Sequence, residues 1–229
     1  MDPKEGLLYV TLDSGHSENV SPVDILDWVK ERSGTNQIPE VEGAYIYRAT
    51  GIAEPTPEKP EWLVMWEFEN ADTSTTNSLA TIEMPNPGKV YRRDLFSLQS
   101  RYTAASFSRA DLLKSRATNF IVAVIIVLNE ELKAEYDKYY EEEHIGALRK
   151  VPGWRRTRRF VEIREDGNKR TRQGEVQILQ LHDYDPGNYG VGGQEFKEAT
   201  STSWYRKMMA NAVKTKDRRT YELYGTAGF

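Results

Sequence analysis

The sequence repeats itself, and this repeat limits the possible folds more than any other feature of the chain. Three segments of the first half recur in the same order in the second half: Val41-Glu42-Gly43 as Val151-Pro152-Gly153, Trp62 to Phe68 as Val176 to Tyr184, and Arg92-Arg93 as Arg218-Arg219. A single match of this kind is weak, but an ordered set indicates internal duplication. We therefore predict two copies of one structural unit within the 229 residues.

The first copy is predicted to have the order βαββαβ. Ser21-Pro22-Val23-Asp24 is typical of a helix start, with a capping serine followed by proline and an acid. This helix is expected to end near Arg32, and a second, polar helix is expected from about Asp72. The strands are expected at residues 6–12, 45–49, 62–68 and 91–98.

The second copy is predicted to follow the same plan with longer loops. Asn129 is expected to cap a helix that ends near Lys150, and a second helix is expected at residues 195–213. Asp166-Gly167 is a hairpin signal, and a glycine-rich loop spans residues 187–193. The strands are expected at residues 120–128, 154–163, 176–184 and 218–224.

The order βαββαβ is the ferredoxin-like split pattern, whose sheet has one face covered by helices and one face open. Two such units in one chain can cover each other's open faces. The expected fold class is thus α+β, with two ferredoxin-like repeats fused into an intramolecular α/β barrel. We assign residues 1–103 to the N-terminal repeat, 104–116 to a linker and 117–229 to the C-terminal repeat.

The composition excludes several classes of function. There are no cysteines, which removes disulfides, thiolate zinc sites and thiol nucleophiles. The three histidines lack metal-site spacing, and no phosphate-binding glycine motif is present. The net charge of −4, the absence of a long apolar run and the lack of a signal peptide lead us to expect a cytoplasmic protein that binds neither nucleic acid nor membrane.

One stretch of the second copy resembles a known family. Tyr139-Tyr140-Glu141-Glu142-Glu143-His144, followed by a segment that begins Val151-Pro152-Gly153-Trp154, is similar to the signature of the dimeric α/β-barrel superfamily. Together with Gly6-Leu7-Leu8-Tyr9-Val10-Thr11, it more closely resembles the fungal EthD-like tandem proteins. This superfamily includes cofactor-free polyketide cyclases, lactone isomerases, quinone-forming monooxygenases, haem enzymes and stress-response proteins.

The first copy departs from this signature. It reads Trp28-Val29-Lys30-Glu31-Arg32-Ser33, so the tyrosine and the Glu-His pair are absent. The resemblance therefore implies a site in the second copy only, with a degenerate first copy that serves to close the barrel.

Helical periodicity places Glu143 in the middle of the apolar stripe of its helix and His144 at the edge of that stripe. A carboxylate that points toward a core suits proton transfer. Alternatively, Glu143 forms a structural ion pair with Arg158 or Arg156 on the next strand, and His144 caps the helix end or bonds to a backbone carbonyl.

The strand at residues 176–184 provides a second candidate. Alternation places His182 and Gln180 on one face of this strand, which suggests the wall of a polar cavity, although an exposed strand end is an equal alternative. His16 is interpreted as a loop residue.

The chain is also rich in aromatic residues, with 13 tyrosines. Individually each suits a core, but together they suit a pocket for a flat ligand. The expected binding residues are Tyr136, Tyr139, Trp154, Arg158, Trp66 and Gln180.

These observations, with the resemblance, predict a cofactor-independent enzyme that acts by acid–base chemistry on a small aromatic or polyketide-like molecule, as a monomer or homodimer. The reaction is a cyclisation, dehydration, isomerisation or decarboxylation through an enol. His144 is the expected acid or base, Glu143 tunes it, and Tyr140 and His182 polarise the substrate oxygen. A quinone-forming monooxygenase and a non-catalytic ligand-binding barrel are the alternatives, and haem binding is a minor one.

Overall fold

The computed structural model describes residues 5–13, 22–34, 41–50, 60–69, 89–108, 120–163, 171–185 and 190–228. The elements of the N-terminal repeat are β1 (Gly6–Asp13), α1 (Pro22–Gly34), β2 (Val41–Ala49), β3 (Trp62–Phe68) and β4 (Lys89–Thr103). Those of the C-terminal repeat are β5 (Phe120–Asn129), η1 (Glu130–Leu132), α4 (Lys133–Tyr139), η2 (Tyr140–His144), α5 (Ile145–Leu148), β6 (Trp154–Glu162), β7 (Glu175–Tyr184), α6 (Gln194–Ala199), α7 (Ser203–Asn211) and β8 (Val213–Gly228).

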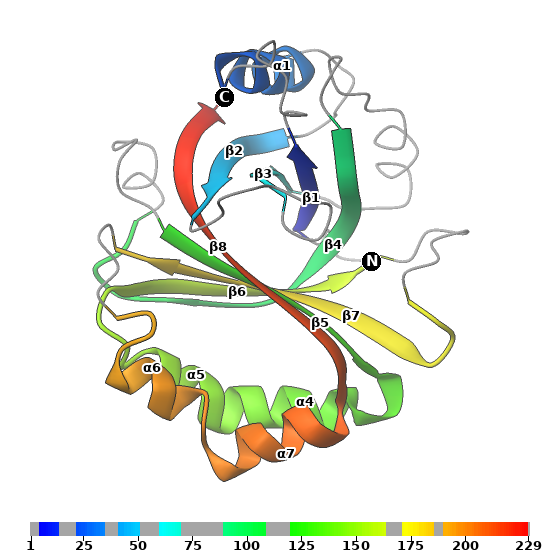
Figure 1. Cartoon of the computed structure of the whole chain (residues 1–229), viewed down its shortest axis with the longest axis vertical. Coiled ribbons are helices and arrows are strands. Elements are labelled where there is room, and N and C mark those ends of the chain that lie inside the picture. Colours follow the sequence, from blue (N-terminus) through cyan, green and yellow to red (C-terminus); the bar gives the residue numbers. More distant parts are fainter. Residues whose placement is uncertain are drawn as a thin grey trace.

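The strands close into one antiparallel barrel in the order β1-β3-β2-β8-β5-β7-β6-β4 (Figure 1). Within this order, β4-β1-β3-β2 and β8-β5-β7-β6 are two ferredoxin-like sheets with the same internal sequence of strands. The predicted fold class is confirmed.

The long last strand of each repeat joins the two sheets. β8 pairs with β5 of its own repeat and with β2 of the other repeat, where Tyr47 lies opposite Leu223. β4 likewise pairs with β1 and with β6, where Leu98 lies opposite Phe160. No sheet edge is left open among the described strands, which removes the exposed ladder groups that an edge strand would present.

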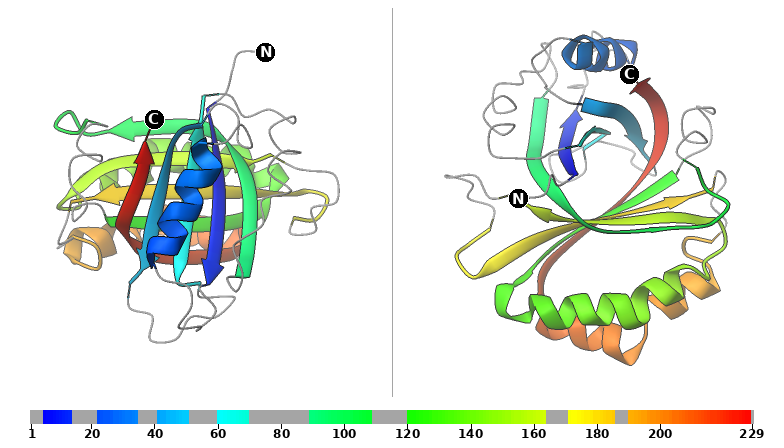
Figure 2. Two further views of the ribbon diagram at one scale, coloured as in Figure 1. Left: turned by 90° about the horizontal axis from the view of Figure 1, so that it is seen from above. Right: turned by 180° about the vertical axis from the view of Figure 1, so that it is seen from behind.

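Helices cover opposite sides of the barrel. α1 crosses the outer face of the N-terminal sheet, and α4 to α7 cover the outer face of the C-terminal sheet (Figures 1 and 2). On the first side, Trp28 of α1 packs edge-to-face on Trp66 of β3 with ring centroids 5.7 Å apart. No described helix has the length and apolar character needed to cross a membrane.

β5 shows why its sequence is an almost continuous apolar run. Ile121, Ala123 and Ile125 belong to the core inside the barrel. Val122, Val124 and Ile126 belong to the core between the sheet and α4 to α7. Because both faces of the strand are covered, period-2 alternation of polar residues is absent, and β-branched side chains fit the pleated surface on each side.

The boundaries differ from the predictions at two helices. The helix predicted from Asn129 to Lys150 is a succession of 3₁₀, α, π and α segments. The helix predicted at 195–213 is divided into α6 and α7, and β8 begins at Val213, earlier than expected. The helix near Asp72, the Asp166-Gly167 turn, His16, residues 187–189 of the glycine-rich loop and linker residues 109–116 lie outside the described residues.

Candidate functional site

A cavity of about 150 Å³ lies between the C-terminal sheet and its helices. Its apolar wall comes from strand β5 and from the helices, and its polar residues come from β7, β8, η2, α4, α7 and the residue that follows α6. The described lining residues are Val122, Val124, Ile126, Tyr136, His144, Leu148, Gln180, His182, Phe196, Thr200, Tyr205, Met209, Lys216 and Arg218. A cavity of roughly 150 Å³ holds a molecule of about the size of one benzene ring.

His144 is buried at the end of the π-helical turn and has a defined tautomer. Its Nδ1 lies 3.1 Å from the carbonyl oxygen of Ala199, the last residue of α6. A carbonyl oxygen can only accept, so Nδ1 carries the proton and Nε2 carries the lone pair. Burial lowers the pKa of His144 to about 4, against the opposing effect of the Ala199 carbonyl, and the positive charges of Lys216 and Arg159 lower it further.

His182 lines the same cavity from β7. Alternation puts Ile178, Gln180 and His182 on the helix side of the sheet and Leu179 and Leu181 inside the barrel, as the strand pattern predicts. Burial lowers the pKa of His182 to about 3; the neighbouring His144 lowers it, and Asp183 acts in the opposite direction. Both imidazoles are therefore neutral near pH 7.

Tyr136 and Gln180 form a polar pair in the wall of the cavity. Gln180 Nε2 donates to the Tyr136 hydroxyl oxygen at 2.8 Å. Burial raises the pKa of Tyr136 to about 12, although the bond from Gln180 acts to lower it. The phenol thus keeps its proton, and that proton is not used in the bond with Gln180.

Two cations of β8 lie at the cavity, and no acidic side chain is among its described lining residues. Lys216 Nζ donates to the Tyr205 hydroxyl at 2.7 Å. The Arg218 guanidinium lies 4.7 Å from the ring centroid of Phe196, a cation–π contact that orients it. The cavity therefore favours an anionic ligand.

Glu143 is half-buried and does not line the cavity. Its carboxylate accepts a hydrogen bond from Thr202 Oγ1 at 2.5 Å, and Thr202 in turn caps α7 by accepting from the backbone N–H of Tyr205. The ion pair of Glu143 with Arg158 or Arg156 does not form, because these arginines point into the barrel and not toward the helices. Glu143 instead holds the start of the helix that carries Tyr205 and Met209.

Three further predicted site residues lie in the helix-side core, beside the cavity but not in its lining. Tyr139 and Tyr140 are buried with hydroxyl groups that have no partner among the described residues. Arg159 stacks on Tyr140 at 4.1 Å, and burial raises the pKa of Tyr140 well above its usual value. Trp154 donates from Nε1 to Thr157 Oγ1 at 2.9 Å.

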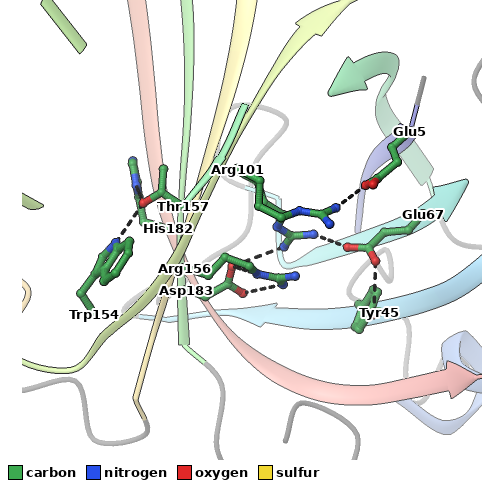
Figure 3. A network of polar contacts seen from close by, with 10 residues as sticks. Glu5, Tyr45, Glu67, Arg101, Trp154, Arg156, Thr157, His182 and Asp183 are labelled. Carbon is green, nitrogen blue, oxygen red and sulfur yellow. Dashed lines mark hydrogen bonds and ion pairs between the residues drawn. The ribbon is translucent and has the colours of Figure 1, made fainter. Parts of the chain in front are cut away.

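Two other predicted binding residues are remote from the cavity. Trp66 is buried in the core under α1. Arg158 lies inside the barrel, where it pairs with Glu67 and Asp183. Figure 3 shows Glu67 and Asp183 on one side of the strands and His182 with Thr157 on the other. The structure thus brings together His144, His182, Tyr136 and Gln180, and separates them from Trp66 and Arg158.

Lys216, Arg218 and Phe196 are lining residues that the sequence reasoning did not select. In the sequence, Arg218 stands out only as part of the repeated Arg-Arg pair. Alternation along β8, taken from a strand start at Val213, would have placed Lys216 and Arg218 on one face.

The described residues contain no cluster of three or more histidine, aspartate or glutamate side chains arranged to hold a metal ion. The cavity has the volume of a single aromatic ring, and a porphyrin has four pyrrole rings. Haem therefore does not fit this cavity.

The overall structure resembles several solved structures. An anthrone oxidase-like protein matches with a TM-score of 0.62 at 10% identity, over 99% of this chain and 94% of that one. A proposed monooxygenase from Fusobacterium nucleatum matches with a TM-score of 0.60 at 12% identity, over 100% and 96%. A single-residue mutant of chlorite dismutase from Candidatus Nitrospira defluvii matches with a TM-score of 0.58 at 9% identity, over 97% and 92%.

The chain has the dimeric α/β-barrel fold. Another neighbour is a Listeria monocytogenes ferredoxin-fold protein related to antibiotic biosynthesis monooxygenases, with a TM-score of 0.51 at 10% identity, over 96% and 95%. No family model matches the sequence, and no curated protein matches it. At these identities the likeness concerns the fold, and the function has to be argued from the cavity.

Proposed function

We propose that the cavity is the active site of a cofactor-independent enzyme that performs acid–base chemistry on a small aromatic or polyketide-like molecule. The observation that carries this proposal is the state of His144. Its tautomer leaves Nε2 as a base, and burial keeps the ring neutral at physiological pH. The lone pair of this neutral imidazole is free to take a proton from a substrate bound in the cavity. Burial also makes His144 a weaker base than free imidazole, so proton removal depends on stabilisation of the anion that forms.

The other lining groups support the formation of an anion. When His144 Nε2 takes a proton from a carbon next to a carbonyl group, negative charge develops on the carbonyl oxygen. The Tyr136 hydroxyl and the second imidazole, His182, can donate to that oxygen, and Lys216 and Arg218 stabilise its charge. Cyclisation, dehydration, isomerisation and decarboxylation can all proceed through such an enolate. Glu143 acts as a positioning residue through Thr202 and α7.

We also propose that the chain belongs to the EthD-like tandem proteins. The matched residues at Gly6–Thr11 and Tyr139–His144 support it, as does the location of the His144 cavity in the second repeat.

A second candidate function is a cofactor-free monooxygenase that makes a quinone. Its support is the structural likeness to an anthrone oxidase-like protein. The first step would be removal of the hydroxyl proton of a single-ring phenol by His144; a ring carbon of the phenolate would then react with O₂, and phenol and O₂ would become benzoquinone and water. Oxygen consumption separates this reaction from the redox-neutral ones.

The test uses phenylpyruvate, a single-ring molecule with an enolisable carbonyl and a carboxylate. In D₂O, the wild-type protein should accelerate exchange of the benzylic C–H, measured by proton NMR, and His144→Gln should lower this rate by roughly 100-fold or more. Unchanged exchange in a folded His144→Gln protein would sink the assignment of the base. Binding of phenylpyruvate by the wild type without any accelerated exchange would favour the non-catalytic alternative.

A further inference from the structure

The hydroxyl group of Thr157 lies between two ring systems on the helix side of the C-terminal sheet. Thr157 is on β6, opposite His182 of β7 in the strand register. Trp154 Nε1 donates to Thr157 Oγ1 at 2.9 Å, and Thr157 Oγ1 lies 3.1 Å from His182 Nδ1 (Figure 3). Thr157 is 0% exposed, so water does not reach its hydroxyl.

The donors and acceptors in this chain of contacts allow only one arrangement in which each group is satisfied. An indole N–H can only donate, so Trp154 occupies one lone pair of the threonine oxygen. Among the described residues, His182 Nδ1 is the remaining group within hydrogen-bond distance of that oxygen. If Nδ1 carried a proton and donated it, the buried hydroxyl proton of Thr157 would have no acceptor, at a cost of about 1–3 kcal/mol.

We infer that Thr157 donates to His182 Nδ1 and thereby holds His182 with its proton on Nε2, so that His182 presents a hydrogen-bond donor to the cavity. His144 has the opposite tautomer, because the Ala199 carbonyl takes its Nδ1 proton. The cavity then has one imidazole that accepts and one that donates. Thr157, which is not itself a lining residue, acts as a positioning residue for His182.

This arrangement also specifies the ligand, in a step that rests on the proposed function. The complementary ligand offers an acidic hydrogen to His144 Nε2 and, close by, an oxygen acceptor to His182 Nε2–H. A carbonyl compound with a hydrogen on the neighbouring carbon has both features. With His182 in the other tautomer the cavity would have two imidazole acceptors, and it would lose this donor to the developing oxyanion.

The test is nitrogen-15 NMR of histidine-labelled protein, whose three histidines can be assigned by single substitutions. Without any ligand, the wild type should show His182 protonated on Nε2 and His144 protonated on Nδ1. Thr157→Val should move His182 toward the Nδ1–H form, Thr157→Ser should restore the wild-type spectrum, and Thr11→Val, which alters a buried threonine of β1, should leave it unchanged.

Two results would overturn the inference: a wild-type His182 with its proton on Nδ1, or an Nε2–H form that persists in Thr157→Val. Should Thr157→Val not fold, the wild-type spectrum alone decides the tautomer. In the exchange assay, Thr157→Val should lower kcat by roughly 10- to 100-fold with little change in KM. Because the spectra need no substrate, failure of the proposed reaction and failure of the tautomer assignment give different results.

Discussion

His182 and Asp183 are consecutive residues of β7 whose side chains lie on opposite faces of the sheet. His182 lines the cavity on the helix side, whereas Asp183 points into the barrel and binds Arg156 and Arg158. Asp183 acts to raise the pKa of His182, but burial outweighs it and the imidazole remains neutral. The sheet thus separates a cavity with neutral bases from a charged group inside the barrel.

The first prediction concerns that charged group. Asp183→Asn should lower the free energy of unfolding by about 3–5 kcal/mol, because Arg156 and Arg158 are buried and would lose a compensating charge. The measurement is urea unfolding followed by circular dichroism. Asp185→Asn is the matched control, since Asp185 pairs with Arg155 at the surface and should contribute less than about 1 kcal/mol. Equal effects of the two substitutions would contradict the prediction.

The second prediction concerns pH. In the unfolded chain histidine has a pKa of about 6.5, whereas burial lowers the pKa of His144 to about 4 and that of His182 to about 3. Below pH 6.5 the unfolded state therefore binds protons that the folded state does not, so the free energy of unfolding falls as the pH falls from 6.5 toward 4.

Urea unfolding at pH 7, 6 and 5 measures this dependence, and His144→Gln should reduce the slope because one of the two buried imidazoles is removed. The loss attributable to His144 should be on the order of 3 kcal/mol when the titration is complete. Carboxylates also titrate at low pH, but they are common to both proteins and cancel in the difference. An identical slope in the two proteins would refute the burial of His144 in its neutral form.

The third prediction concerns the anion preference of the cavity. Benzoate should bind more tightly than benzamide, which has a similar shape and no charge, as measured by NMR titration. Arg218→Gln should weaken benzoate binding by roughly fivefold and leave benzamide binding unchanged, because it removes one favourable charge interaction of about 1 kcal/mol. Arg206→Gln, a change at an exposed arginine of α7, is the control and should affect neither ligand. Equal affinity of the wild type for the two probes would exclude the anion preference.

The fourth prediction compares two tyrosines one turn apart. Tyr136 has its hydroxyl in the cavity wall and bonded to Gln180, whereas the Tyr140 hydroxyl is buried without a partner among the described residues. Tyr136→Phe should lower the exchange rate by roughly tenfold or more and cost about 1 kcal/mol of stability. Tyr140→Phe should leave the rate within about twofold and cost no stability, because it removes an unsatisfied buried hydroxyl. The reverse pattern would restore Tyr140 as the substrate-polarising group.

Most of the fold could be predicted from the repeat and from the strand patterns. The shared order of the matched segments predicts two similar sheets, and alternation on β7 separates Gln180 and His182 from Leu179 and Leu181. The pairing of β4 with β6 and of β8 with β2 could be expected only as a general requirement to close the barrel, because no local pattern specifies a register between distant strands.

The site was harder to predict at its helix. A rotation of 100° per residue places Glu143 at the centre of the buried face and His144 at its edge, but the structure buries His144 and leaves Glu143 half-buried. The reason is the π-helical turn at Tyr140–His144, which puts more residues into one turn and shifts all later side chains around the axis. Such turns have no reliable signature in a single sequence. The positions of Glu143 and His144 around the helix axis could therefore not be predicted correctly.

Strands β4 and β8 each pair with strands of both repeats, and this pairing affects how the sequence of the molecule can evolve. In a barrel built from two identical chains, every substitution appears twice, and neither site can be altered without the other. Here the two halves share one continuous polypeptide, and the N-terminal half can accept Arg32-Ser33 in place of the Glu-His pair while it still supplies β2 and β4 to its neighbour. If the chemistry lies in the His144 cavity, as proposed, the N-terminal half needs to keep only the residues that close the barrel.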